Sequence, residues 1–177
     1  MVNLTKASRE LFQRTPDERF GSFDALLAHC NQRRERSNEY WQLSRDLRIE
    51  QADTGLQLRL DDEENAQLSL CDWSFSQLCK LCGVQKDTVN KLTSETASRV
   101  FHDTLPHSRK PLQVYAAADT ALAVHSSTYS RLFDAEVLEA VREAAPDFTP
   151  PPTGIDGATG LYAGEQYMFA FGIDPDG

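Results

Sequence analysis

The chain has 177 residues, enough for one domain with a hydrophobic core and few for two. Hydrophobic residues make up 40% of the chain and charged residues 25%, which is ordinary for a soluble globular protein, and the formal net charge is −9. This acidic balance counts against a domain that coats nucleic acid with a broad basic face, because such domains neutralise phosphates with Lys and Arg. It leaves room for a small basic patch.

The sequence also predicts where the protein resides. No apolar run reaches the roughly 20 residues of a membrane-spanning helix. Residues 1–15 lack the apolar segment of a signal peptide. We therefore expect a soluble, cytoplasmic protein with no membrane partner. Its four cysteines should then be reduced thiols: Cys30, Cys71, Cys79 and Cys82.

The first third of the chain predicts an arm, a helix and a hairpin. Residues 1–20 are polar and should form a loosely ordered arm before a single domain over residues 21–177. Ser22 is a typical N-cap, and the apolar residues behind it at helical spacing are Phe23, Leu26, Leu27 and Cys30. From residue 47 to 60 apolar and polar residues alternate around the turn Asp53-Thr54-Gly55, which predicts a two-stranded hairpin. A third strand is expected at residues 66–70.

The rest of the chain predicts further helices and strands. Helical patterns cover residues 73–92 and 95–105, and a second hairpin is expected from the apolar runs 112–118 and 121–126. Asp134 should cap a helix that ends at Pro146, and a final strand should cover residues 167–173. We therefore predict an α+β fold whose antiparallel sheet comes from two hairpins plus the C-terminal strand, covered by helices. The expected core residues are Leu58, Phe75, Leu78, Val114, Val124, Leu138 and Phe169.

The stretch from residue 74 to 93 has the pattern of a helix-turn-helix. Gly83 would supply a left-handed turn between two helices, and Val84, Val89 and Leu92 would seat the second helix on the first. The side chains that would then meet phosphates and base edges are Lys80, Lys86, Thr88, Asn90 and Lys91. His107, Arg109 and Lys110 would add a second basic loop. The alternative is a two-helix cap on a sheet that never touches DNA.

The same stretch contains the CxxC motif Cys79-Lys-Leu-Cys82. Zinc sites match such a pair with a second ligand pair at compact spacing, and this chain has no second CxxC. Because Cys79 lies on the apolar stripe of the expected helix, both cysteines are better explained as buried small hydrophobic residues. We expect no bound zinc, no other cofactor and no disulfide.

Support for catalysis is weak. The chain has no GxSxG, GxxxxGK[ST] or HExxH motif, and His125 beside serines on a strand is typical of a structural histidine. The carboxylates of residues 61–64 are typical of a solvated turn. Residues 153–160, TGIDGATG, make a poor phosphate loop because they follow no clear strand and open no helix. We assign no catalytic residue.

Three segments resemble one known family. They are DWSFSQLCKLCGVQKDTVNKL, ALAVHSSTYSRLFDAEVLEAV and QYMFAFGIDPD. Together they are similar to the phage/plasmid-like proteins classed as domain-of-unknown-function family 932, over about residues 71–177. The chain keeps Tyr129 and Arg131, but has Ser127-Thr128 where the family commonly has Asp-Arg and Ser130 where it has a basic residue. Members usually continue further, so the resemblance implies the front part of that domain, naturally short or cut.

The resemblance implies a protein carried on a bacterial mobile element and brings no assigned activity. We therefore expect a non-enzymatic accessory protein that binds DNA or a host protein. The alternative is an acidic protein that mimics the charge of DNA and blocks a host DNA-binding surface. The net charge of −9 is the observation that suggests it. An enzyme is the third hypothesis. The sequence leaves the partner and the oligomeric state open.

Overall fold

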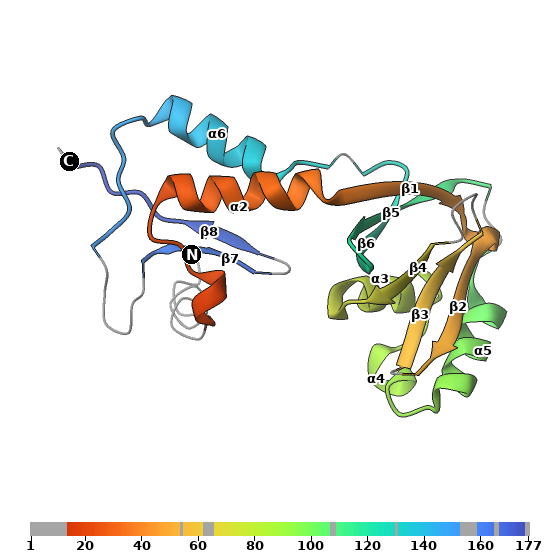
Figure 1. The fold of residues 1–177 in the computed structure, drawn as a ribbon. Coiled ribbons are helices and arrows are strands. Elements are labelled where there is room, and N and C mark those ends of the chain that lie inside the picture. The colour runs from red at the N-terminus through yellow and green to blue at the C-terminus, as the bar shows by residue number, and fades with distance from the viewer. Residues whose placement is uncertain are drawn as a thin grey trace. The chain divides into compact units, whose positions relative to one another are not determined.

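The computed structural model, drawn in Figure 1, describes residues 14–53, 55–61, 66–106, 109–129, 131–152, 159–164 and 167–175. Its contacts divide the chain into two compact units. We call Arg36–Ser130 the sheet unit, and Met1–Glu35 together with Arg131–Gly177 the hairpin unit. The single domain expected over residues 21–177 stays a prediction, because a division by contacts does not measure cooperative unfolding.

The sheet unit contains a six-stranded sheet in the order β1-β5-β6-β4-β3-β2. The strands are β1 (Ser37–Leu43), β2 (Leu47–Ala52), β3 (Gly55–Leu60), β4 (Gln67–Leu70), β5 (Pro111–Ala117) and β6 (Thr120–Ser126), with a short 3₁₀ turn η2 (Ser44–Asp46) between β1 and β2. The two predicted hairpins are confirmed, with Ile49 opposite Leu58 and Val114 opposite Val124.

Two features of this sheet differ from the prediction. The sheet is mixed and not purely antiparallel, because β4 pairs with β6 in parallel at Ser69↔Thr120 and Leu70↔Ala121. The sheet also contains β1, a strand that the sequence did not predict and that pairs antiparallel with β5 along its whole length. Its sequence SNEYWQL is mostly polar, so the strand is defined by long-range pairing and not by an alternating pattern of its own.

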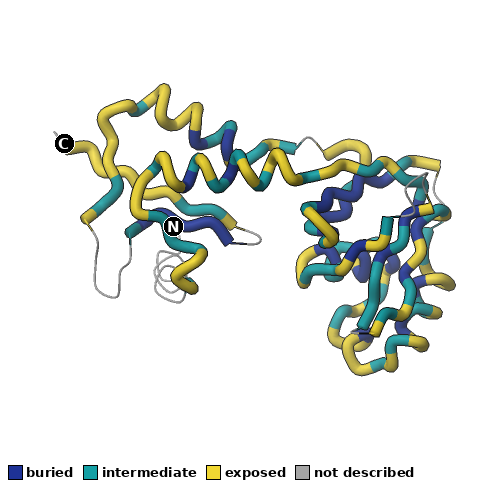
Figure 2. Tube along the Cα trace, in the orientation of Figure 1, coloured by how far each residue is buried: buried dark blue, intermediate teal, exposed yellow. Residues whose placement is uncertain are grey.

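Three helices of the sheet unit pack on this sheet: α3 (Asp72–Leu81), α4 (Lys86–Val89) and α5 (Ser94–Thr104). Helix α3 contacts β4 and β6, and α5 contacts β2 and β3. The interface between strands and helices holds the larger core cluster, in which Leu58, Leu78 and Phe101 are fully buried (Figure 2). Of the seven expected core residues, Leu58, Leu78, Val114, Val124 and Leu138 are buried, whereas Phe75 and Phe169 are only partly buried.

The hairpin unit is smaller. Its described elements are a 3₁₀ turn η1 (Pro16–Glu18), α2 (Phe23–Glu35), α6 (Asp134–Ala144) and the antiparallel strands β7 (Leu161–Ala163) and β8 (Met168–Ala170). Ser22 caps α2 as expected, since its Oγ accepts the N–H of Ala25 at 3.1 Å. The core joins α2, α6 and β7 through Leu26, Cys30, Ala135, Leu138, Leu161 and Ala163.

This unit corrects further expectations. The C-terminal strand does not join the large sheet but forms its own two-stranded sheet with β7, which the sequence analysis missed. Helix α6 begins at Asp134, and Phe133 is its N-cap, with the Glu136 carboxylate accepting the Phe133 N–H at 3.3 Å. Residues 14–20, expected in the loose arm, contact β7, because Phe20 donates its N–H to Leu161 O at 3.0 Å. Residues 1–13 lie outside the described residues.

No helix among the described residues combines the length and the apolar character that crossing a bilayer demands.

Candidate functional site

The helix-turn-helix pattern is only partly present. Gly83 takes φ +68° at the end of α3, so the expected left-handed turn is confirmed. The second helix, however, is α4 with four residues, and the chain then turns into α5, whose N-cap Thr93 accepts the Thr96 N–H at 3.3 Å. A single helical turn presents too few side chains to act as a recognition helix in a major groove.

The six candidate nucleic-acid residues do not form one surface. Lys80, Asn90 and Lys91 are exposed around α3 and α4, and Lys86 pairs with the Asp72 carboxylate. Arg109 and Lys110 are exposed just before β5, and His107 lies outside the described residues.

The strand register separates these two groups. Asn90 lines a hollow with Gly55, at the far end of the β2–β3 hairpin. Arg109 and Lys110 instead precede Pro111, which pairs with Leu43 just before β2 begins. Asn90 and Arg109 with Lys110 therefore lie toward opposite ends of β2, a strand about 17 Å long at 3.3 Å per residue.

The helix layer is also electrically balanced. Between residues 72 and 104 the chain has four Lys or Arg residues and four Asp or Glu residues. The basic ones are Lys80, Lys86, Lys91 and Arg99, and the acidic ones are Asp72, Asp87, Glu95 and Asp103. A surface that binds phosphates needs an excess of positive charge, so this layer does not fit a duplex.

The cysteines of the CxxC motif are buried, as predicted. Cys79 and Cys82 are 2% and 9% exposed, and burial raises the pKa of both thiols. All four cysteines are free. Within the described residues, His, Cys, Asp and Glu side chains make no group of three that could hold a metal ion. Cys71 has a structural position that the sequence analysis did not predict, because its Sγ accepts the Ser74 N–H and caps α3.

His125 is held by α3. The Oε1 atom of Gln77 accepts the Val124 N–H at 2.8 Å, which directs the Gln77 Nε2 group to His125 Nδ1 at 3.2 Å. Because an amide nitrogen only donates, His125 Nδ1 accepts and the ring carries its proton on Nε2. Tyr129 stacks on the imidazole ring, with 4.1 Å between ring centroids. This arrangement agrees with the structural role that the sequence predicted for His125.

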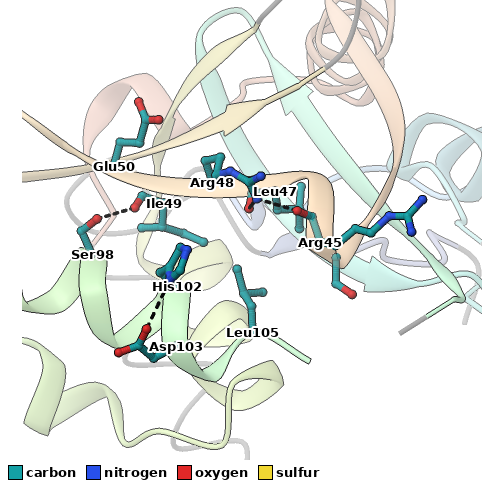
Figure 3. A pocket seen from close by; sticks show the side chains of 10 residues that line it. Arg45, Leu47, Arg48, Ile49, Glu50, Ser98, His102, Asp103 and Leu105 are labelled. Atoms are coloured by element: carbon teal, nitrogen blue, oxygen red, sulfur yellow. Dashed lines mark hydrogen bonds and ion pairs between the residues drawn. The ribbon is translucent and has the colours of Figure 1, made fainter. Parts of the chain in front are cut away.

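The candidate binding site is a groove between β2 and α5, which we call the β2 groove (Figure 3). Its volume is about 730 Å³, within the range of ligand pockets. Leu47, Ile49 and Leu105 supply its apolar lining. Its polar lining residues are Ser44, Arg45, Arg48, Glu50, Ser98, His102 and Asp103.

Ion pairs balance most of the charge around the β2 groove. Arg48 lies 3.7 Å from Asp61, and Glu50 lies 3.3 Å from Arg59. His102 Nδ1 lies 3.1 Å from the Asp103 carboxylate on α5. Arg45 reaches Asp46 at 3.5 Å, yet its side chain is 68% exposed. Arg45 is therefore the more exposed of the two arginines at the end of the groove where β2 begins, since the Arg48 side chain is 44% exposed.

The strand that borders the groove is an outer strand of the sheet. Within the described residues β2 pairs with β3 alone. The N–H of Leu60 in β3 donates to Ala66 O at 2.9 Å, on the β4 side, so Leu60 makes no ladder bond to its partner Leu47.

Alternation then decides which residues of β2 point outward. Ladder bonds to β3 come from every second residue of β2, beginning at Arg48. The backbone groups of Leu47, Ile49 and Gln51 therefore point away from β3. The Ser98 hydroxyl of α5 confirms this direction, because it donates to Ile49 O at 2.6 Å from the outer side.

The residues of this groove were not predicted from the sequence. The alternation of Leu47 and Ile49 predicted which side chains of β2 are buried. It carried no signal that β2 is an outer strand, because strand order depends on pairing between distant segments. Ser98 and Arg45 are ordinary polar residues whose positions matter only once α5 lies beside β2.

No protein-family model, curated protein or solved structure matches this chain. The resemblance to family 932 stays a prediction, and no residue role is taken from a relative.

Proposed function

We propose that the chain is a non-enzymatic accessory protein of a phage, plasmid or other mobile element, and that it acts by binding a host protein. The mobile-element setting rests on the resemblance over residues 71–177. The observation that supports protein binding is the β2 groove, an open hollow of about 730 Å³ beside an outer sheet edge. A hollow that combines an apolar lining with polar groups can accept side chains of a protein partner.

The charge distribution favours a protein partner over DNA. Lys86, central to the DNA hypothesis, already pairs with Asp72, so a phosphate would have to displace a carboxylate. The remaining candidates, Lys80 and Lys91, belong to a helix layer whose charges balance. A few phosphate contacts from such a layer would give weak binding that salt abolishes.

The DNA-mimic alternative is supported by one helix. Asp134, Glu139 and Glu143 of α6 are exposed carboxylates, and they add to the net charge of −9. Around the β2 groove, by contrast, Asp61 and Asp103 take part in ion pairs. The alternative therefore draws on carboxylates away from the β2 groove.

A pull-down from lysate of a bacterial host, with and without nuclease, tests the proposal. The bait is the full chain, and the matched variant carries Lys86→Glu and Lys91→Glu, which reverse the charges of the DNA hypothesis without touching the groove. We expect the same captured proteins in all four arms. Loss of capture after nuclease, or in the double variant, would show that nucleic acid mediates the binding and would contradict the proposal.

A direct binding assay completes the test. Fluorescence anisotropy of a labelled 24-bp duplex (about two helical turns) should show no binding to the wild type even at low salt. Binding at low salt that the double variant abolishes would instead support DNA reading by α3 and α4.

A further inference from the structure

We infer that β1 pairs edge to edge with β1 of a second copy of this chain, which joins two six-stranded sheets into one. The inference goes beyond the proposed function and does not depend on it, because β1 and β2 lie at opposite ends of the strand order. It rests on the open edge of β1, on the direction of its backbone groups, and on a sequence that matches itself in one register.

The two outer strands of the sheet differ in what covers them. Helix α5 covers the edge of β2, where Leu47 and Ile49 are 1% and 5% exposed and Ser98 holds the Ile49 carbonyl. On β1, by contrast, Glu39 is exposed and Trp41 is 51% exposed. Within the described residues β1 pairs with β5 alone. A long outer strand without proline is a template for a further strand.

The sheet itself shows which backbone groups of β1 point outward. Val124 of β6 donates its N–H to α3 at 2.8 Å, so it makes no ladder bond to Val114, its partner on β5. Bonds to the two neighbours alternate along an antiparallel strand, so Val114 bonds to Tyr40 of β1 instead. The backbone groups of Glu39 and Trp41, on either side of Tyr40, therefore point away from β5 and are directed at an added strand.

The sequence of β1 matches an antiparallel copy of itself best about a two-fold axis at Tyr40. In this register all seven residues of the strand lie opposite a residue of the second strand. Glu39 and Trp41 exchange backbone bonds across the axis, because both point outward. An axis at Glu39 or at Trp41 would match only residues 37–41 or 39–43.

Charge favours the same register. Glu39 is the one charged residue of β1. An axis at Glu39 would set two carboxylates directly opposite each other, which destabilises strand pairing. With the axis at Tyr40, each carboxylate lies opposite an uncharged indole, and the half-exposed Trp41 of one copy covers the methylene groups of Glu39 in the other. The strand is therefore complementary to itself.

The size of the contact predicts its strength. The exposed half of each Trp41 side chain would cover about 100 Å², out of roughly 200 Å² for the whole side chain. Stable interfaces bury about 1,200–2,000 Å² in total, so this pairing depends mainly on backbone hydrogen bonds. We expect a reversible dimer with a Kd of about 10–100 µM.

Sedimentation velocity of the full chain between about 1 and 500 µM tests the pairing, since this range spans the expected Kd. The diagnostic variant is Glu39→Pro, which removes an outward N–H that β5 does not use, and Pro is tolerated on an outer strand at such a position. The matched control is Glu39→Thr, which keeps the N–H. The Kd of the dimer should rise about tenfold or more in Glu39→Pro and stay within about threefold of the wild type in Glu39→Thr.

Cysteine cross-linking tests the register without a proline. With the axis at Tyr40, Asn38 lies opposite Gln42 of the second copy in a pair whose Cα atoms are about 4.5 Å apart, a distance that a disulfide spans. A mixture of Asn38→Cys and Gln42→Cys should therefore form cross-linked dimers under mild oxidation. Either variant alone should not, because its two cysteines would lie four residues apart along the strands. The wild type controls for the native thiols.

Three results would overturn the inference: a wild type that stays monomeric over the whole range, a dimer that Glu39→Pro leaves unchanged, or a mixture that cross-links no better than the single variants. A monomer whose Glu39 and Trp41 amides are protected from hydrogen exchange by a captured host protein would assign the edge of β1 to that protein instead. Each of these outcomes leaves the proposed function standing. Capture of host proteins that depends on nucleic acid would refute the proposed function and leave the dimer untouched.

Discussion

Replacing Gln77 with Met removes the side chain that closes the free part of the β6 edge. Strand β4 pairs with β6 through Ser69 and Leu70. Further along β6, the Gln77 Oε1 atom accepts the Val124 N–H at 2.8 Å, and the Gln77 Nε2 atom contacts His125 at 3.2 Å. Met has a similar length and no polar group. The variant leaves a backbone donor unpaired in a residue that is 7% exposed.

The magnitude follows from the two lost bonds. An unsatisfied buried N–H costs about 1–3 kcal/mol, and the bond to His125 adds about 0.5–1.5 kcal/mol, so Gln77→Met should lower the free energy of unfolding by about 1.5–4.5 kcal/mol. Urea denaturation followed by circular dichroism measures this loss. The control Gln77→Glu keeps an acceptor for Val124 and should cost roughly half as much. A change below about 0.5 kcal/mol in Gln77→Met would refute the reasoning.

Three further predictions concern the fold. Gly83→Ala should cost about 1–2 kcal/mol because of the φ of +68°, whereas Gly21→Ala, in open space without a positive φ, should change stability far less. Burial raises the pKa of the Cys30 thiol from 9.0 to about 11, so its contribution to stability is complete below pH 9 and is lost as the pH rises to 11. The melting temperature of Cys30→Ala should accordingly fall less steeply than that of the wild type over this pH window. We expect residues 21–177 to unfold as one domain. Leu138→Ala in the hairpin unit and Leu58→Ala in the sheet unit should then each lower the midpoint of one common urea transition. Two separate transitions would contradict the single domain.

Local patterns predicted much of this fold. The alternation of Leu56, Leu58 and Leu60 defines a strand with one buried face, and Gly83 defines the end of a helix. Ser22 marks the start of α2, and its cap is present. In each case the residues that carry the signal lie within a few positions of the structure that they determine.

The features that the sequence analysis missed depend on distant pairing. Nothing in residues 37–43 indicates a strand until β5 lies beside it, and the parallel contact of β4 with β6 joins residues about fifty positions apart. Helix α4 ends at Val89, and Thr93 caps the next helix, α5. The apolar spacing through Leu92 predicted one longer helix, and it did not show that the cap at Thr93 would start a separate one. The β2 groove requires both the strand order and the placement of α5, so no short motif could have predicted it.

Amide hydrogen exchange, measured with and without the captured host protein, tests the central claim most directly. If the host protein binds in the β2 groove, it should slow exchange at residues 45–50 of the strand side and 98–105 of the helix side, with little change at Lys86 to Lys91. Unchanged exchange along the groove, with protection at Lys86 to Lys91 instead, would contradict the account and return the binding site to the helix layer.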